Sequence, residues 1–192
     1  LKEGTGNSHP GQGTACRRFF FSNAYLELLW VADAHEAWDE AARPTRLWER
    51  WAQRRGGACP FGIVLRAGAH ETDPRPPFES WSYRPAYLPG GLSIEIARET
   101  PLTEPVFSYL GFMRERAGAG REPIRHDLPI EDLTGVTVCR PAAALSAAAR
   151  ALQDAGLVAF RDGDDFLMEL DFDEARRGSA DLRPALPLTL RW

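Results

Sequence analysis

The chain has 192 residues, of which 44% are hydrophobic and 26% are charged, and its formal net charge is -4. This acidic balance, without a basic stripe interleaved with aromatics, is not typical of nucleic-acid-binding proteins. No apolar run approaches the roughly 20 residues of a membrane helix. We therefore expect a soluble globular protein with neither nucleic acid nor a membrane as a partner.

The three cysteines, Cys16, Cys59 and Cys139, lie far apart and form no CxxC pair. Their spacing predicts neither a disulfide framework nor a zinc motif. Such a pattern is typical of a reducing compartment, and we expect the protein to be cytoplasmic.

The chain begins with a glycine-punctuated loop, which is followed by two apolar segments at 15–21 and 24–31. Ser22 and Asn23 form a short turn between them, so the two segments predict an antiparallel hairpin. In the second segment Glu27 stands among hydrophobic residues. Burying an ionised carboxylate without a partner costs several kcal/mol or more. Glu27 is therefore expected to face water or to be held by a cation, a proton or a ligand.

The middle of the chain predicts a mixture of helices and strands. Two helices are expected at 34–42 and 45–55, with Pro44 between them and Gly56 and Gly57 at the end. Strands are expected at 61–66, 81–88 and 92–98. The segment 100–112 is ambiguous between helix and loop, and the segment 114–123, rich in charge, Gly and Ala, is the best linker candidate.

The last third has the clearest pattern. A strand at 133–139 is followed by a helix at 142–155, which Pro141 opens and Gly156 closes. Further strands are expected at 157–160, 166–172 and 186–191. This order predicts a strand-helix-strand-strand-strand unit.

Three predicted strands share a local pattern, a glutamate between aliphatic neighbours, at Glu27, Glu95 and Glu169. Two interpretations remain open. The pattern is either the trace of three repeated modules or a chance feature of strands that face water on one side.

The motifs NSHPGQGTACRRFFF (7–21) and NAYLELLWV (23–31) resemble the glyoxalase-like domain family of the vicinal oxygen chelate superfamily. The resemblance extends more loosely over 60–98 and the terminal unit. It implies an α+β fold of βαβββ modules whose mixed sheets form a cup around a small-molecule site. Residues 1–113 would form a module pair whose first strand and helix precede Leu1, and residues 124–192 a further module on the same body.

The resemblance also implies a metal site. Metal-using members of the superfamily take ligands from the first and fourth strands of each module, typically His, Gln or Glu from the first and Glu from the fourth. By this pattern Glu27 and Glu95 would bind one divalent ion such as Mg, Mn, Fe, Ni or Zn. The strand 61–66 contains no His, Gln or Glu, so these residues do not complete a ligand set.

Further candidates come from the residues around Glu27, which itself could shuttle a proton as a catalytic group. His9 is a second catalytic candidate, as a base or ligand, although a turn-stabilising or exposed role is the alternative. Arg18 is predicted to face the cup, where it would bind an anionic substrate. Tyr25 and Gln12 complete the predicted substrate contacts. A nucleotide cofactor is not expected, because the GxG of the loop precedes no convincing helix and the Walker lysine is missing.

Three functions remain open from the sequence. The first is a glyoxalase-like protein that binds a small oxygen-rich molecule, with metal-dependent lyase, isomerase or dioxygenase activity. The second is a non-catalytic protein that sequesters an aromatic or drug-like compound in the same cup. The third is a structural module whose exposed strands pair in a homodimer. The fold does not decide among them.

Overall fold

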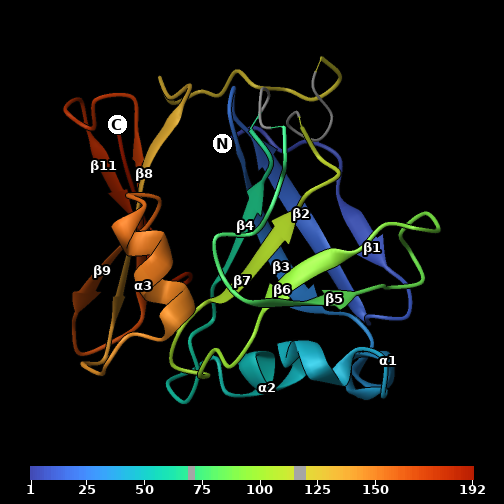
Figure 1. Cartoon of the computed structure of the whole chain (residues 1–192). Helices are drawn as coiled ribbons and strands as arrows, with labels where there is room; N and C mark the ends of the chain where they lie inside the picture. Colours follow the sequence, from blue (N-terminus) through green and yellow to red (C-terminus); the bar gives the residue numbers. More distant parts are fainter. Residues whose placement is uncertain (69–71, 115–119) are drawn as a thin grey trace.

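The computed structural model describes residues 1–68, 72–114 and 120–192. Within them the chain forms twelve strands, three α-helices and one short 3-10 helix, arranged as three separate sheets. The predicted α+β class is confirmed. Strands β1–β7 occupy one side of the molecule and the C-terminal strands the other, with α1 and α2 at one end (Figure 1).

The first sheet is an antiparallel meander in the order β1-β2-β3. Its strands are β1 (Asn7–His9), β2 (Thr14–Phe20) and β3 (Tyr25–Val31). The predicted hairpin is confirmed as β2 and β3. The short strand β1 was expected to be part of a loop, because it is surrounded by Gly and Pro residues, which are typical of loops.

Two short helices follow, α1 (Ala34–Trp38) and α2 (Leu47–Ala52), with the 3-10 helix η1 (Arg43–Thr45) between them. Asp33 caps α1 by accepting hydrogen bonds from the backbone N–H groups of His35 and Glu36. Both helices are shorter than predicted. The first ends because Asp39 is extended, and the second begins only after Arg46, which has a left-handed conformation.

The second sheet is mixed, in the order β4-β7-β6-β5. Its strands are β4 (Gly62–Arg66), β5 (Ser80–Tyr83), β6 (Ile94–Ala97) and β7 (Val106–Leu110). The ambiguous segment 100–112 therefore supplies a strand, β7, which pairs in parallel with β4. The described part of the connection from β4 to β5 contains no helix, so the described residues do not confirm a βαβββ module here.

The third sheet is formed by the C-terminal unit, in the order β11-β12-β10-β8-β9. Its elements are β8 (Leu133–Arg140), α3 (Ala147–Asp154), β9 (Ala159–Asp162), β10 (Leu167–Phe172), β11 (Ser179–Asp181) and β12 (Leu188–Arg191). The predicted strand-helix-strand-strand-strand order is present, with β11 as an additional strand. Helix α3 begins later than the predicted residue 142, because Ser146 is its N-cap. The Ser146 hydroxyl accepts a hydrogen bond from the backbone N–H of Ala149.

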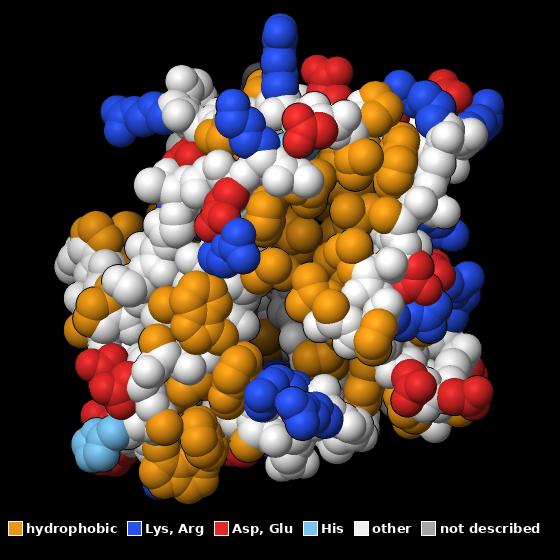
Figure 2. Space-filling model, turned by 180° about the vertical axis from the view of Figure 1, so that it is seen from behind, with side chains coloured by type: hydrophobic (Ala, Val, Ile, Leu, Met, Phe, Trp, Pro, Cys, Tyr) orange, Lys and Arg blue, Asp and Glu red, His pale blue; other side chains and the backbone are white. Residues whose placement is uncertain are grey.

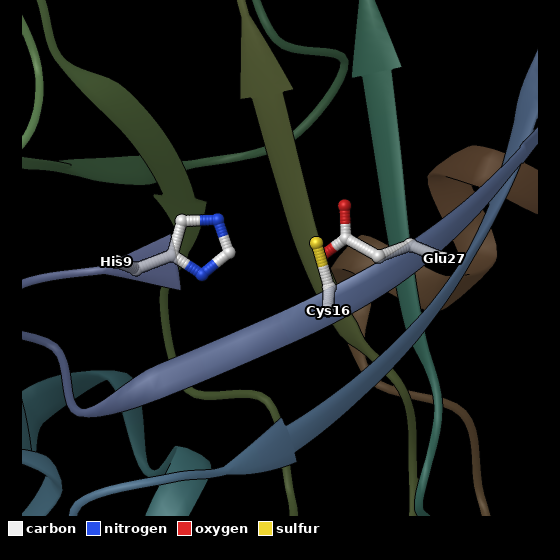
Figure 3. A group of neighbouring side chains, drawn as sticks. All are labelled: His9, Cys16 and Glu27. Carbon is white, nitrogen blue, oxygen red and sulfur yellow. The ribbon is translucent and has the colours of Figure 1, made fainter. Parts of the chain in front are cut away.

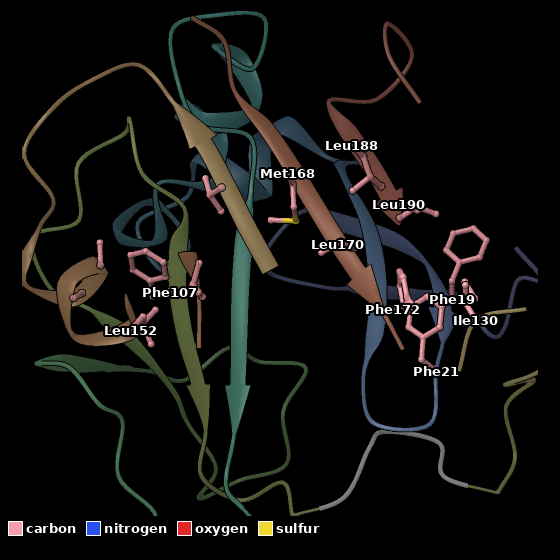
Figure 4. Packing of buried hydrophobic residues seen from close by; sticks show 14 of the residues in the cluster. Phe19, Phe21, Phe107, Ile130, Leu152, Met168, Leu170, Phe172, Leu188 and Leu190 are labelled. Atoms are coloured by element: carbon pink, nitrogen blue, oxygen red, sulfur yellow. The ribbon is translucent and has the colours of Figure 1, made fainter. Parts of the chain in front are cut away.

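One hydrophobic core joins the three sheets. Phe21 at the end of β2 packs on Phe172 of β10, with ring centroids 4.5 Å apart, and Phe107 of β7 meets Phe160 of β9 edge to face at 6.3 Å. Figure 4 shows part of this cluster. The first and second sheets thus each turn one face towards the C-terminal sheet.

The opposite faces of these two sheets form the surface on which the candidate site lies. Leu29 of β3 and Val64 of β4 are on these faces and remain 38% and 54% exposed. A view from behind shows hydrophobic side chains gathered around a hollow in the surface of the molecule (Figure 2).

None of the described helices is long and apolar enough to cross a membrane. The centre of the predicted linker, residues 115–119, lies outside the described residues. The division into 1–113 and 124–192 stays a prediction.

Candidate metal centre

Three potential metal ligands lie on adjacent strands of the first sheet. His9 is on β1, Cys16 on β2 and Glu27 on β3. In the strand register His9 pairs with Thr14, and Glu27 pairs with Arg18. Thr14 and Arg18 lie two residues before and two residues after Cys16 on β2. The three side chains are therefore diagonal neighbours on one face of the sheet, close enough for their ends to meet (Figure 3).

The ligand atoms of His9, Cys16 and Glu27 all lie within 4.8 Å of one another. His9 and Cys16 are buried, whereas Glu27 is half-buried. One nitrogen, one sulfur and one carboxylate oxygen around a common point match the three protein ligands of an open tetrahedral site.

A hydrogen bond joins the Cys16 thiol and the Glu27 carboxyl group. Burial and the nearby Glu27 charge raise the pKa of the Cys16 thiol to about 11. Burial also raises the pKa of Glu27, while the positive charge of Arg18 and a hydrogen bond with Cys16 oppose this shift. A divalent ion at this point would replace the thiol proton and favour the charged forms of both side chains.

The imidazole of His9 is held at both nitrogens. Its Nε2 lies 3.2 Å from the Asn7 amide nitrogen, which donates, and its Nδ1 lies 2.9 Å from the Thr14 hydroxyl oxygen. This arrangement assigns the proton to Nδ1 and the lone pair to Nε2. Burial and the charge of Arg18 lower the pKa of His9, so the ring is kept in the neutral form that binds metals.

A second layer of hydrogen bonds supports His9. The Thr14 hydroxyl accepts from the Gln12 amide at 2.8 Å, and the Gln12 carbonyl oxygen accepts from the Tyr87 hydroxyl at 3.1 Å. The Tyr87 ring also lies 4.9 Å from the ring of His9. Such outer partners fix the tautomer and orientation of a metal-binding histidine.

The turn from β1 to β2 is anchored to helix α1. Gly11 and Gly13 have positive φ angles of 78° and 70°, which suit glycine, and both donate backbone hydrogen bonds to the Glu36 carboxylate. The Gly13 carbonyl in turn accepts from the N–H groups of Ala32 and Asp33. The glycines of the loop therefore position His9 and Gln12 rather than binding a phosphate.

The structure places several of the predicted site residues on one face of the first sheet. His9 and Glu27 share the centre, and Arg18 lies opposite Glu27 on the same face of the hairpin. Arg17 faces away and pairs with Glu3. Tyr25 is also on the Glu27 face, and its pKa is raised to about 12 by burial and by the Glu27 charge. Gln12 is buried and uses both ends of its amide in the second layer, so it acts as a support.

The structure separates Glu95 from the centre. Glu95 lies on β6, which is the third strand of its sheet in chain order and not the fourth. Its carboxylate accepts hydrogen bonds from the hydroxyls of Ser80, Ser82 and Ser93. It shares a sheet face with Tyr109, opposite to the face of Ile96. Glu95 does not belong to the group of His9, Cys16 and Glu27, and its pairing with Glu27 around one metal stays a prediction.

Cys16 is the member of this group that was not predicted from the sequence. The spacing of Cys16 from the other cysteines does not indicate a metal site, but its position in the predicted hairpin relates it to Glu27. Once the turn at Ser22 and Asn23 is fixed, alternation places Cys16 on the same side as Arg18 and Glu27. Glu169, the third glutamate of the repeated pattern, instead forms ion pairs with Arg161 and Arg191.

The donor set fits some metals better than others. A thiolate is a soft ligand, and an imidazole is a borderline one, so the set favours Zn, Fe or Ni over Mg, which prefers oxygen ligands. Of the ions that the resemblance implies, Zn matches the combination of nitrogen, sulfur and oxygen best.

Comparison with known proteins does not assign the chain to a family. No protein-family model matches the chain, and neither the curated proteins nor the solved structures contain a match.

Proposed function

We propose that this protein binds a divalent transition-metal ion, preferably Zn, through His9, Cys16 and Glu27, and a small oxygen-rich molecule next to it. The observation that carries the proposal is the convergence of the three ligand atoms within 4.8 Å. The support of His9 by Thr14 and Gln12 adds to it, because a fixed second layer is typical of functional metal sites.

With three protein ligands, the ion would keep a position for an oxygen atom of the small molecule. A metal in this setting supplies Lewis-acid chemistry, which polarises a bound carbonyl or stabilises an enediolate. Arg18 adds a positive charge beside Glu27, which favours an anionic ligand. This chemistry agrees with a glyoxalase-like lyase, isomerase or dioxygenase and does not select among them.

A second candidate function is non-catalytic binding of an aromatic or other apolar compound. It is favoured by Leu29 and Val64, which are exposed apolar side chains on the sheet faces turned away from the C-terminal sheet. Tight binding of such a compound to the metal-free protein, without turnover, would support this role.

Zinc binding tests the proposal. After dialysis against zinc, we expect one equivalent to remain on the wild-type protein. Glu27→Gln should weaken zinc binding at least about tenfold, because it removes a charged ligand. Glu95→Gln is the matched control, since Glu95 is a half-buried strand carboxylate outside the group of His9, Cys16 and Glu27. No zinc on the wild type, or equal losses in the two variants, would contradict the proposal.

A further inference from the structure

Tyr83, at the end of β5, has a buried hydroxyl without a hydrogen-bond partner among the described residues. The side chain is only 4% exposed. Buried tyrosine hydroxyls in proteins usually have a partner. This polar atom therefore distinguishes Tyr83 from the other residues on its sheet face.

The sheet face of Tyr83 is the one that also carries Val64 of β4. Tyr83 pairs with Ile94 on β6 and lies on the same face as Trp81, whose ring is 5.9 Å away. The alternate residues of the sheet, including Ala97 and Phe107, pack into the core. Tyr83 is thus on the side of the second sheet that is turned away from the C-terminal unit.

Tyr87 connects Tyr83 to the metal centre. Its ring contacts His9, and its hydroxyl binds Gln12. Burial raises the pKa of Tyr87, and the proximity of Tyr83, Glu27 and Tyr25 raises it further. Tyr83 and Glu27 are thus both close enough to Tyr87 to influence its charge, and Tyr87 itself contacts His9 of the candidate metal centre.

We propose that the Tyr83 hydroxyl is a second anchor for the ligand of this site. This inference rests on the proposed function. It narrows the ligand to a small molecule with two separated oxygen functions, one that binds the metal at His9, Cys16 and Glu27 and one that forms a hydrogen bond with Tyr83. Tyr83 would then select among metal-binding molecules by their far end, because a ligand without the second oxygen leaves a buried hydroxyl unsatisfied.

Paired probes test this inference on the zinc-loaded protein. Benzohydroxamate binds metals through two oxygens, and its 3-hydroxy and 4-hydroxy derivatives add an oxygen at the far end. By calorimetry we expect at least one hydroxy derivative to bind the wild type about 3- to 10-fold more tightly than benzohydroxamate, as a neutral hydrogen bond would give. This gain should disappear in Tyr83→Phe, which keeps the ring.

Tyr109→Phe is the matched control. Tyr109 is equally buried, at 4% exposure, but lies on the opposite face of the same sheet, so the gain should persist in this variant. A gain that survives in Tyr83→Phe, or no gain or no hydroxamate binding in the zinc-loaded wild type, would overturn the inference alone. Failure of the wild type to bind zinc would overturn the proposed function and this inference together.

Discussion

At the scale of residues, the site depends on how His9 is held. The Thr14 hydroxyl contacts Nδ1 of the ring, so Nε2, which accepts from the Asn7 amide, is the nitrogen that a metal ion would bind in place of that hydrogen bond. Without the Thr14 contact the imidazole would be free to rotate or to change tautomer, and the protein would bind a metal ion more weakly. Gln12 contributes by binding the same hydroxyl.

Thr14→Val tests this role, because valine has nearly the same shape but no hydroxyl. We expect the variant to bind zinc about 10- to 100-fold more weakly than the wild type, in line with the loss of a second-layer partner. Competition with a chromophoric chelator measures the affinity. Thr137→Val in β8 of the C-terminal sheet provides the control and should bind zinc normally; an unchanged affinity in Thr14→Val would show that Thr14 does not orient the ligand.

At the scale of elements, the turn between β1 and β2 determines where the ligands meet. A Cβ atom on Gly13 would lie 2.2 Å from the carbonyl oxygen of Asp33 and 2.5 Å from the backbone nitrogen of Ala37, and the backbone is left-handed at this position. The turn is thus packed directly against the start of α1. Any residue other than glycine would push His9 away from Cys16.

We therefore expect Gly13→Ala to lower the free energy of unfolding by at least about 2 kcal/mol, from the left-handed conformation and the backbone clash combined. Zinc affinity should fall with it. Urea denaturation measures the first effect. Gly90→Ala, where a Cβ atom meets nothing within 4 Å, should change stability by less than about 1 kcal/mol; equal effects of the two substitutions would contradict this account of the turn.

The elements also show how far the sequence could predict this molecule. The hairpin β2–β3 and the C-terminal unit followed from alternation and caps, which are local signals. Strand β1 was hidden by the Gly and Pro residues around it, whereas the pairing of β4 with β7 depends on contacts distant in sequence, which no local pattern contains. Glu27 and His9 were predicted as candidates from their local context, but joining them to Cys16 required the register of the sheet.

At the scale of the whole molecule, the sheet that carries the site is not independent of the C-terminal unit. Phe21 directly follows β2 and packs on Phe172 of β10 in the shared core. Leu26 and Leu28 of β3 also pack against this core, on the face opposite to Glu27. Burial of this face fixes the orientation of the ligands on the other one.

Phe172→Ala tests this coupling. Removal of a fully buried ring should cost about 3–5 kcal/mol, and the whole chain should still unfold in one transition. Tryptophan fluorescence reports mainly on residues 1–113, which hold five of the six tryptophans, whereas far-ultraviolet circular dichroism reports on all strands. Coinciding curves from the two probes are expected; separate transitions would mean that the N-terminal sheets fold without the C-terminal unit.

The most direct test of the metal centre is the absorption spectrum of the cobalt-loaded protein. Cobalt bound to a thiolate gives a sulfur-to-metal charge-transfer band in the near ultraviolet. We predict this band in the wild type, its loss in Cys16→Ser and its retention in Cys139→Ser, because Cys139 lies on β8 outside the His9–Cys16–Glu27 group. A wild-type protein without the band, or a band that persists in Cys16→Ser, would contradict the assignment of Cys16, with His9 and Glu27, as the metal ligands.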